Sequence, residues 1–113
     1  MKEKDQDTYR KYRILAYTAG QYRAYQNLVN QKIYDMALDS LISTIGRCEE
    51  YSSDAKELGC EGEISDIQAK AEEALEAFKI DTEKALEVYD MKDRTAYSKE
   101  IYQILDDAGL SEE

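Results

Sequence analysis

The residue types that could support chemistry in this chain are carboxylates, tyrosines and two cysteines, because its 113 residues include no histidine. Without histidine there is no imidazole general base, no histidine-activated nucleophile and no histidine ligand for zinc or a di-iron site. A mechanism based on carboxylates alone would need two of them in an apolar cleft, where burial shifts their pKa. The acidic residues here lie opposite the apolar stripes of predicted helices, so we expect a protein that is not an enzyme and that has no metal or cofactor.

The two cysteines do not form a metal or redox motif. Cys48 and Cys60 are separated by eleven residues, without the paired spacing of zinc or thioredoxin-like sites. We expect two free thiols in a reducing cytoplasm, with a disulfide as the alternative. The charged N-terminus lacks the apolar run of a signal peptide, and no apolar stretch approaches the about 20 residues that cross a bilayer. The expected location is therefore cytoplasmic, without a membrane partner.

Charge is distributed unevenly along the sequence, although the net charge is −10. Residues 8–34 contain no acidic residue and carry +5, whereas residues 35–113 carry −14. The basic segment also contains six of the ten tyrosines. This bipolar pattern predicts two candidate contact surfaces with different partners.

The first candidate surface is an Arg/Tyr face on the helix predicted in the basic segment, opposite its Leu15, Tyr22 and Val29. Arginine and tyrosine often dominate contact energies, and small residues allow a partner backbone to come close. Alternatively, Arg10 and Arg13 pair with the protein's own acidic helices, and Gly20 is only a local helix defect. The residues of the Arg/Tyr face are Arg10, Arg13, Tyr17, Gly20, Arg23 and Ala24.

The second candidate surface is an acidic face on one side of a helix predicted over 65–90. Like charges one turn apart destabilise a helix by a few tenths of a kcal/mol, a small cost that a docking function could justify. The alternative is a solubilising face without a partner. The residues of the acidic face are Glu72, Glu76, Glu83, Glu87 and Asp90.

The elements that must position these residues are all helical, because proline is absent, glycine is scarce and apolar residues recur at helical spacing. Gly59 is typical of a helix C-terminus, Ser65 with Gln68 matches a capping box, and Asp93 and Gly109 bound the last helix. We predict one all-α domain over 1–113, a compact bundle of two helical hairpins. Its four helices cover about 8–29, 31–58, 65–90 and 94–108.

Two apolar stripes meet near Asn30, which leaves the topology of the first half open. A turn there gives the four-helix bundle, and a gentle bend gives a long antiparallel two-helix hairpin with an arm of roughly 75 Å. In the basic segment the predicted buried stripe is Tyr12, Leu15, Ala19, Tyr22, Gln26, Val29 and Ile33. The stripe that follows it is Tyr34, Leu38, Leu41, Ile45 and Cys48. In the third predicted helix it is Ala71, Leu75, Phe78, Thr82, Ala85 and Tyr89.

The charge pattern and the missing catalytic groups favour a non-catalytic protein-binding regulator, inhibitor or adaptor. Its acidic helices would dock on a basic protein surface and could imitate the phosphate row of a nucleic acid. One alternative is a nucleic-acid-associated subunit that uses the basic Tyr/Arg helix, although the net charge opposes it. The other is a structural subunit of a helical assembly or homo-oligomer.

Overall fold

The computed structural model describes residues 2–110, with side chains described from Gln6 onward. The described residues form five α-helices and a short 3₁₀ helix, which confirms the all-α prediction and corrects the predicted number of helices. The elements are α1 (Lys2–Asn30), α2 (Tyr34–Leu58), α3 (Glu61–Ala74), η1 (Leu75–Phe78), α4 (Thr82–Tyr89) and α5 (Arg94–Asp107).

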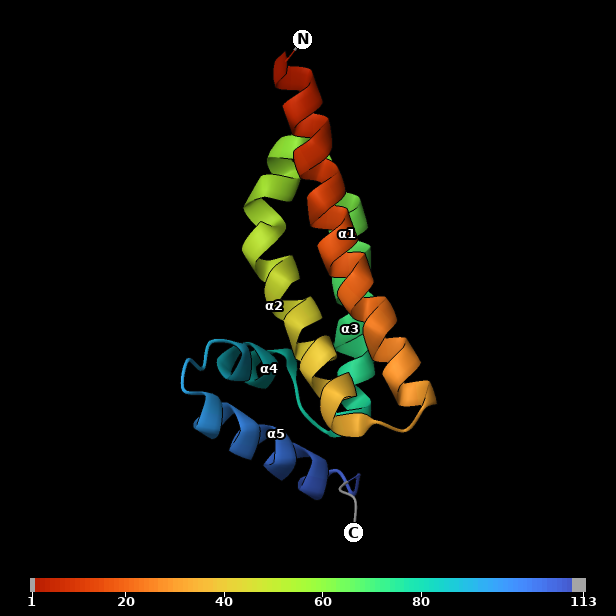
Figure 1. Ribbon diagram of the computed structural model, residues 1–113, viewed down its shortest axis with the longest axis vertical. Coiled ribbons are helices and arrows are strands. Elements are labelled where there is room, and N and C mark those ends of the chain that lie inside the picture. Colours follow the sequence, from red (N-terminus) through yellow and green to blue (C-terminus); the bar gives the residue numbers. More distant parts are fainter. Residues whose placement is uncertain (1, 111–113) are drawn as a thin grey trace.

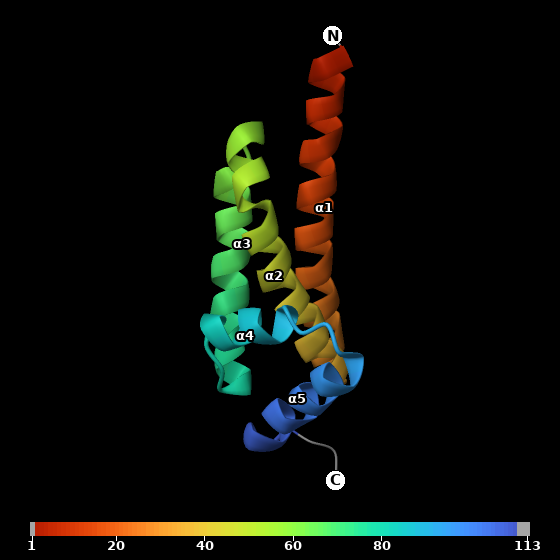
Figure 2. The same cartoon turned by 90° about the vertical axis from the view of Figure 1, so that its left-hand side faces the viewer.

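The three longest helices run side by side along the molecule, each antiparallel to the next in the chain, and α4 and α5 pack at one end (Figure 1). Helix α2 is the centre of the fold and contacts α1, α3, α4 and α5. The N-terminal end of α1 extends beyond the turn between α2 and α3 (Figure 2). The Cα radius of gyration is 15.2 Å, against about 13 Å for a compact domain of this length. The arrangement is therefore more elongated than the predicted compact bundle.

The predicted break near Asn30 is a true turn, so the long two-helix hairpin is wrong. Helix α1 ends at Asn30, and Lys32 adopts a left-handed conformation with φ 62°. The Lys32 N–H donates to the Val29 carbonyl at 2.9 Å, and the Ile33 N–H to the Leu28 carbonyl at 2.9 Å. These bonds satisfy the last carbonyls of α1 and return the chain along it.

The break at Gly59 is confirmed, but the next helix begins four residues earlier than predicted. Gly59 has φ 76°, and the Cys60 N–H donates to the Ala55 carbonyl at 2.9 Å. Helix α3 starts at Glu61, so Ser65 lies inside it and does not act as an N-cap. The start is stabilised by Glu61 and Glu63 in the first turn, near the positive end of the helix dipole.

The helix predicted over 65–90 is interrupted at Lys79. Helix α3 tightens into η1, Lys79 adopts φ 58°, and the Ile80 N–H donates back to the Leu75 carbonyl at 3.4 Å. Asp81 then caps α4 by accepting from the Lys84 N–H at 2.8 Å. The predicted stripe still reaches the core, because Leu75, Phe78 and Ala85 are buried. It does so from two helices joined by a turn.

The last helix matches the prediction at both ends. The Asp93 carboxylate accepts from the N–H groups of Thr95 at 2.9 Å and Ala96 at 3.1 Å. Helix α5 ends at Asp107, and Gly109 has φ 75°. Asp93 and Gly109 therefore act as the N-terminal and C-terminal signals that their residue types indicate.

The buried stripe of α1 is rotated from the predicted one by about one residue. Ile14, Thr18 and Tyr25 are buried, whereas Tyr12 is 69% exposed and Gln26 is exposed. The Thr18 hydroxyl donates to the Ile14 carbonyl at 2.9 Å, so this polar side chain is satisfied within the core. Within the described residues, no helix is long and apolar enough to span a membrane.

Candidate interaction surface

A cation lies between two tyrosines on the exposed side of α1. Tyr9, Arg13 and Tyr17 follow one another at four-residue spacing, which places them on one side of the helix. The Arg13 guanidinium carbon is 6.0 Å from the centroid of the Tyr9 ring and 5.6 Å from that of Tyr17. The contact with Tyr17 raises the pKa of Arg13, so the guanidinium is charged throughout the physiological range. The result is an alternation of aromatic and cationic groups.

Helix α2 adds a second cation to the ring of Tyr17. The Arg47 guanidinium carbon is 5.9 Å from the Tyr17 centroid, and Arg47 Nη1–H donates to the Tyr51 hydroxyl at 3.3 Å. We call the set Tyr9, Arg13, Tyr17, Arg47 and Tyr51 the Tyr/Arg surface. The sequence interpretation missed Arg47 and Tyr51, because the surface exists only once α2 has packed antiparallel to α1. It also left Tyr9 out of the predicted Arg/Tyr face.

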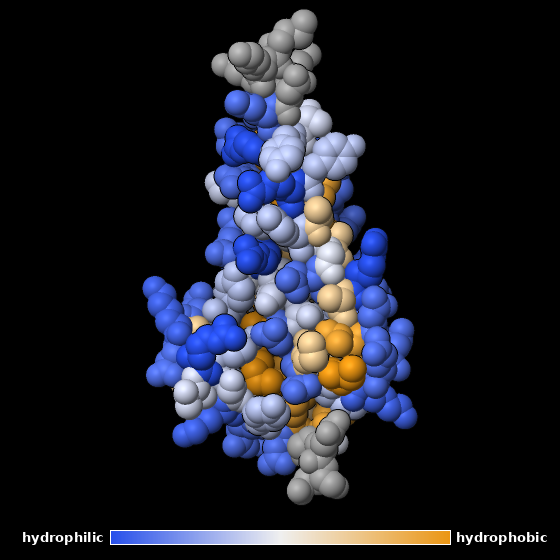
Figure 3. Space-filling view, in the orientation of Figure 1, coloured by the Kyte–Doolittle hydropathy of each residue, from blue (hydrophilic) through white to orange (hydrophobic). Residues whose placement is uncertain are grey.

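Tyr51 is half-buried and packs against the buried cluster that contains the cysteines, whereas Tyr9 and Tyr17 do not fill the core. Tyr9 is 63% exposed and Tyr17 is 47% exposed. On the face of the molecule drawn in Figure 3, the part around the N-terminal half of α1 is mostly hydrophilic, and apolar side chains gather lower down, close to where α1 ends and α2 begins. The Tyr/Arg surface therefore combines aromatic area and positive charge outside the main apolar region.

Arg10 differs from Arg13 in its contacts. It pairs with Asp7 at 3.6 Å on its own helix, and with Asp54 at 3.8 Å and Glu57 at 3.9 Å on α2. The alternative of internal pairing is thus correct for Arg10, whereas Arg13 forms no ion pair within the described residues. These long, exposed contacts contribute little stability individually, but they place carboxylates next to the Tyr/Arg surface.

The remaining residues of the predicted Arg/Tyr face lie further along α1, beyond the stacked side chains of Tyr9, Arg13 and Tyr17. Arg23 and Gly20 are exposed, and Ala24 is half-buried. A Cβ added at Gly20 would meet no atom within 4 Å, so none of the other described helices comes close there. The structure thus gathers Arg13 and Tyr17 with residues of α2 and leaves Gly20 and Arg23 outside that cluster.

The predicted acidic face does not follow one side of one helix. Glu72 lies on α3, Glu76 on η1, and Glu83 and Glu87 on α4, with Asp90 directly after it. Glu72 is half-buried and accepts from the Thr82 hydroxyl at 3.1 Å and from the Gln68 amide at 3.5 Å. It therefore links α3 to the start of α4. The other four carboxylates are exposed.

Three tyrosine hydroxyls tie α4 and α5 to carboxylates on α2. Tyr89 donates to Glu50 at 2.5 Å, Tyr102 donates to Asp35 at 3.4 Å, and Tyr97 donates to Asp39. Burial, followed by the bond to the carboxylate, raises the pKa of Tyr89 to about 12 and that of Tyr97 still further. These bonds hold the C-terminal helices against α2, a role that the sequence alone did not reveal.

The cysteines lie in a buried cluster with Ile14, Ala55 and Ile64, and both are free. Burial is the main cause that raises the pKa of Cys48 to about 12, which keeps its sulfur protonated and a poor nucleophile. Within the described part of the chain, no group of three or more cysteine or acidic side chains is placed to hold a metal ion.

Comparison of the chain with family models, curated proteins and solved structures gave no match.

Proposed function

We propose that this protein is a non-catalytic protein-binding adaptor or regulator, and that the Tyr/Arg surface is its main contact. The observation that carries the proposal is the position of Arg13 between two exposed tyrosine rings. Tyrosine and arginine supply a large share of binding energy in protein interfaces. Tyrosine also gains contact area with little loss of side-chain freedom.

The stacking leaves the positive charges available to a partner. A guanidinium over an aromatic face still presents its N–H donors at the edge, where a carboxylate can bind. Arg13 has no carboxylate partner within the described residues, and Arg47 bonds to the Tyr51 hydroxyl. The favoured partner is therefore a protein segment that brings an acidic group to Arg13 and an apolar or aromatic group to Tyr9 and Tyr17.

A nucleic-acid partner is the second candidate, supported by the aromatic rings on which bases could stack. It is less favoured because Asp54 and Glu57 border the Tyr/Arg surface beside Arg10 and would repel a phosphate backbone. The net charge of −10 adds to this repulsion.

Docking of the acidic face on a basic protein, as an inhibitor or nucleic-acid mimic, is a separate and weaker proposal. Glu72 accepts a hydrogen bond from Thr82 within the fold. The four remaining carboxylates of the acidic face are distributed over η1, α4 and Asp90, directly after α4. Assembly of copies of the chain into a structural oligomer would be visible as a larger particle in any purification.

The matched variants Arg13→Gln and Arg23→Gln test the proposal. Both arginines are exposed on α1 and both variants change the net charge equally, but Arg13 lies in the ring contacts of the Tyr/Arg surface. Tagged proteins are used to capture partners from lysate of the native cell, with and without nuclease. We expect one protein to be captured by the wild type and by Arg23→Gln, to be lost with Arg13→Gln, and to be insensitive to nuclease. Capture that nuclease abolishes, or that survives in Arg13→Gln, would overturn the proposal.

A further inference from the structure

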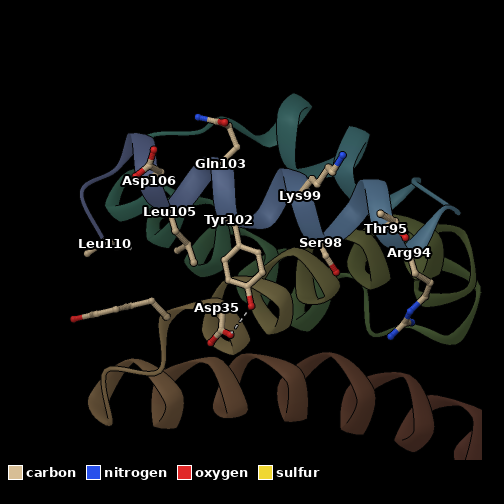
Figure 4. Close-up of a pocket in the computed structure, with 11 residues that line it drawn as sticks. Asp35, Arg94, Thr95, Ser98, Lys99, Tyr102, Gln103, Leu105, Asp106 and Leu110 are labelled. Carbon is tan, nitrogen blue, oxygen red and sulfur yellow. Dashed lines mark hydrogen bonds between the residues drawn. The ribbon is translucent and has the colours of Figure 1, made fainter. Parts of the chain in front are cut away.

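An open groove runs between α5 and the start of α2, at the opposite end of the molecule from the Tyr/Arg surface. Its volume is about 1100 Å³, comparable to that of small-molecule sites, which reach about 1,000 Å³. Arg94, Ser98, Tyr102 and Leu105 line it from α5 and point toward α2 in Figure 4, whereas Lys99 and Gln103 point away. The helical spacing thus places one cation, one hydroxyl, one aromatic ring and one apolar side chain in a row.

Hydrogen bonds on both sides hold the groove in shape. The Tyr102 hydroxyl donates to Asp35 Oδ2 at 3.4 Å across the groove, and Asp35 Oδ1 accepts from the Met36 N–H at 2.8 Å. One helical turn further along α2, Asp39 accepts from Tyr97. Lys84 Nζ on α4 pairs with Glu100 on α5 at 2.7 Å. A ligand would therefore meet walls that are already positioned, which lowers the entropic cost of binding.

The charges in the groove are separated along its length. Arg94 lies at one end and forms no ion pair with a carboxylate between residues 6 and 110, although the chain has 25 acidic residues. Asp35, in the middle, is engaged by Tyr102, and Asp106 lies at the other end. The end near Arg94 is therefore favourable to an anion, and Ser98, one turn away, can donate a hydrogen bond to it.

Beyond Ser98, toward the end where Asp106 lies, the groove becomes apolar (Figure 4). Leu105 is buried, Leu110 is half-buried, and the ring of Tyr102 stands between them and Ser98. An inorganic anion at Arg94 would leave the ring of Tyr102, which is 57% exposed, uncovered, whereas an anion with an aromatic or aliphatic body would cover the ring and gain from its burial.

We propose that this groove is a binding site for a small organic anion. Its carboxylate or phosphate group binds to Arg94 and Ser98, and its apolar body lies against the ring of Tyr102. The site is separate from the Tyr/Arg surface, so it adds a ligand to a protein that is otherwise proposed to bind other proteins.

The test is a titration of the isotope-labelled full-length chain, followed by amide NMR shifts. The probes are phenyl phosphate and benzoate, which distinguish phosphate from carboxylate, and benzyl alcohol, which has the same ring without the charge. We expect saturable shifts at Ser98 and Tyr102 with at least one anion. Affinity should fall by at least about tenfold in Arg94→Gln, because a charge-assisted hydrogen bond is lost.

Lys56→Gln provides the matched control, because Lys56 is an exposed cation in the last turn of α2, far from the groove. Its affinity for the anion should equal that of the wild type. A second variant, Ser98→Ala, should weaken binding less than Arg94→Gln, and it removes an exposed hydroxyl that forms no hydrogen bond between residues 6 and 110. The proposal is overturned if neither anion saturates, if benzyl alcohol binds equally well, or if Arg94→Gln and Lys56→Gln lose affinity equally.

Discussion

The ring of Tyr89 on α4 lies directly against the backbone of Gly46 on α2. A Cβ added at Gly46 would be 2.3 Å from Tyr89 Cγ, closer than any real contact. Only glycine therefore allows α4 to approach α2 this closely and allows the Tyr89 hydroxyl to reach Glu50. This contact explains a glycine in the middle of a long helix, where it otherwise lowers stability.

Gly46→Ala should therefore lower the free energy of unfolding, by about 1 to 3 kcal/mol, because the ring must move away from its packed position. Gly20→Ala is the matched control, since a Cβ there meets open space. It should raise the free energy by up to about 1 kcal/mol through helix propensity alone. Urea unfolding followed by circular dichroism measures both. Equal effects of the two variants would show that the Tyr89 contact is not tight.

Stability should decrease at alkaline pH through the tyrosine–carboxylate bonds. The pKa of Tyr89 is raised in the folded state from 10.0 to about 12, so the unfolded chain loses this proton first as pH rises. The contribution of the protonated Tyr89 hydroxyl to the stability of the folded state is complete below pH 10 and is lost between pH 10 and about 12. Urea unfolding at several pH values should show a shallower decline over this range in Tyr89→Phe than in the wild type. Parallel curves would exclude this role for Tyr89.

The thiols of Cys48 and Cys60 should not react with a chromogenic disulfide reagent in the native protein. Both side chains are buried, and the pKa of Cys48 is raised to about 12 by burial. Both thiols should react rapidly in denaturant. In its absence, the reaction rate should be limited by how often local unfolding exposes the thiols. Immediate reaction of either thiol in the native protein would contradict the packing of the cluster that contains them.

Removal of the Asp93 carboxylate should weaken the start of α5. Asp93→Ala should lower the free energy of unfolding by about 1 kcal/mol, because the N–H groups of Thr95 and Ala96 lose their acceptor. Asp90→Ala is the control, since this nearby exposed carboxylate accepts no hydrogen bond between residues 6 and 110. Thermal unfolding should show a lower midpoint for Asp93→Ala only. A similar loss in both variants would indicate a general charge effect.

Local signals made some parts of the fold predictable. Gly59, Asp93 and Gly109 bound helices as their residue types indicate, because caps depend on hydrogen bonds within a few residues. The turn at Lys79 was missed because a lysine with positive φ has no such signal and is fixed by surrounding packing. Asp81, a residue type favoured at N-caps, was the signal that could have revealed α4.

The features that could not be predicted from the sequence depend on tertiary contacts. The choice of Ile14 and Thr18 over Tyr12 for the core depends on the angle at which α1 meets α2 and on the local bond that satisfies Thr18. The contact between Tyr17 and Arg47 joins residues 30 positions apart on two helices. Arg13 and Tyr17 were therefore visible as a pattern on α1, whereas Tyr9 was left out of that pattern. Arg47 and Tyr51 on α2 were not visible.

The most direct test of the central claim is photo-crosslinking in the native cell from two positions. The photoreactive amino acid benzoylphenylalanine replaces Tyr9 on the Tyr/Arg surface or Glu87 on the acidic face, both exposed. We predict a protein adduct of one defined mass from position 9, resistant to nuclease, and none from position 87. Adducts from position 87 alone, or an adduct from position 9 that nuclease removes, would contradict the account.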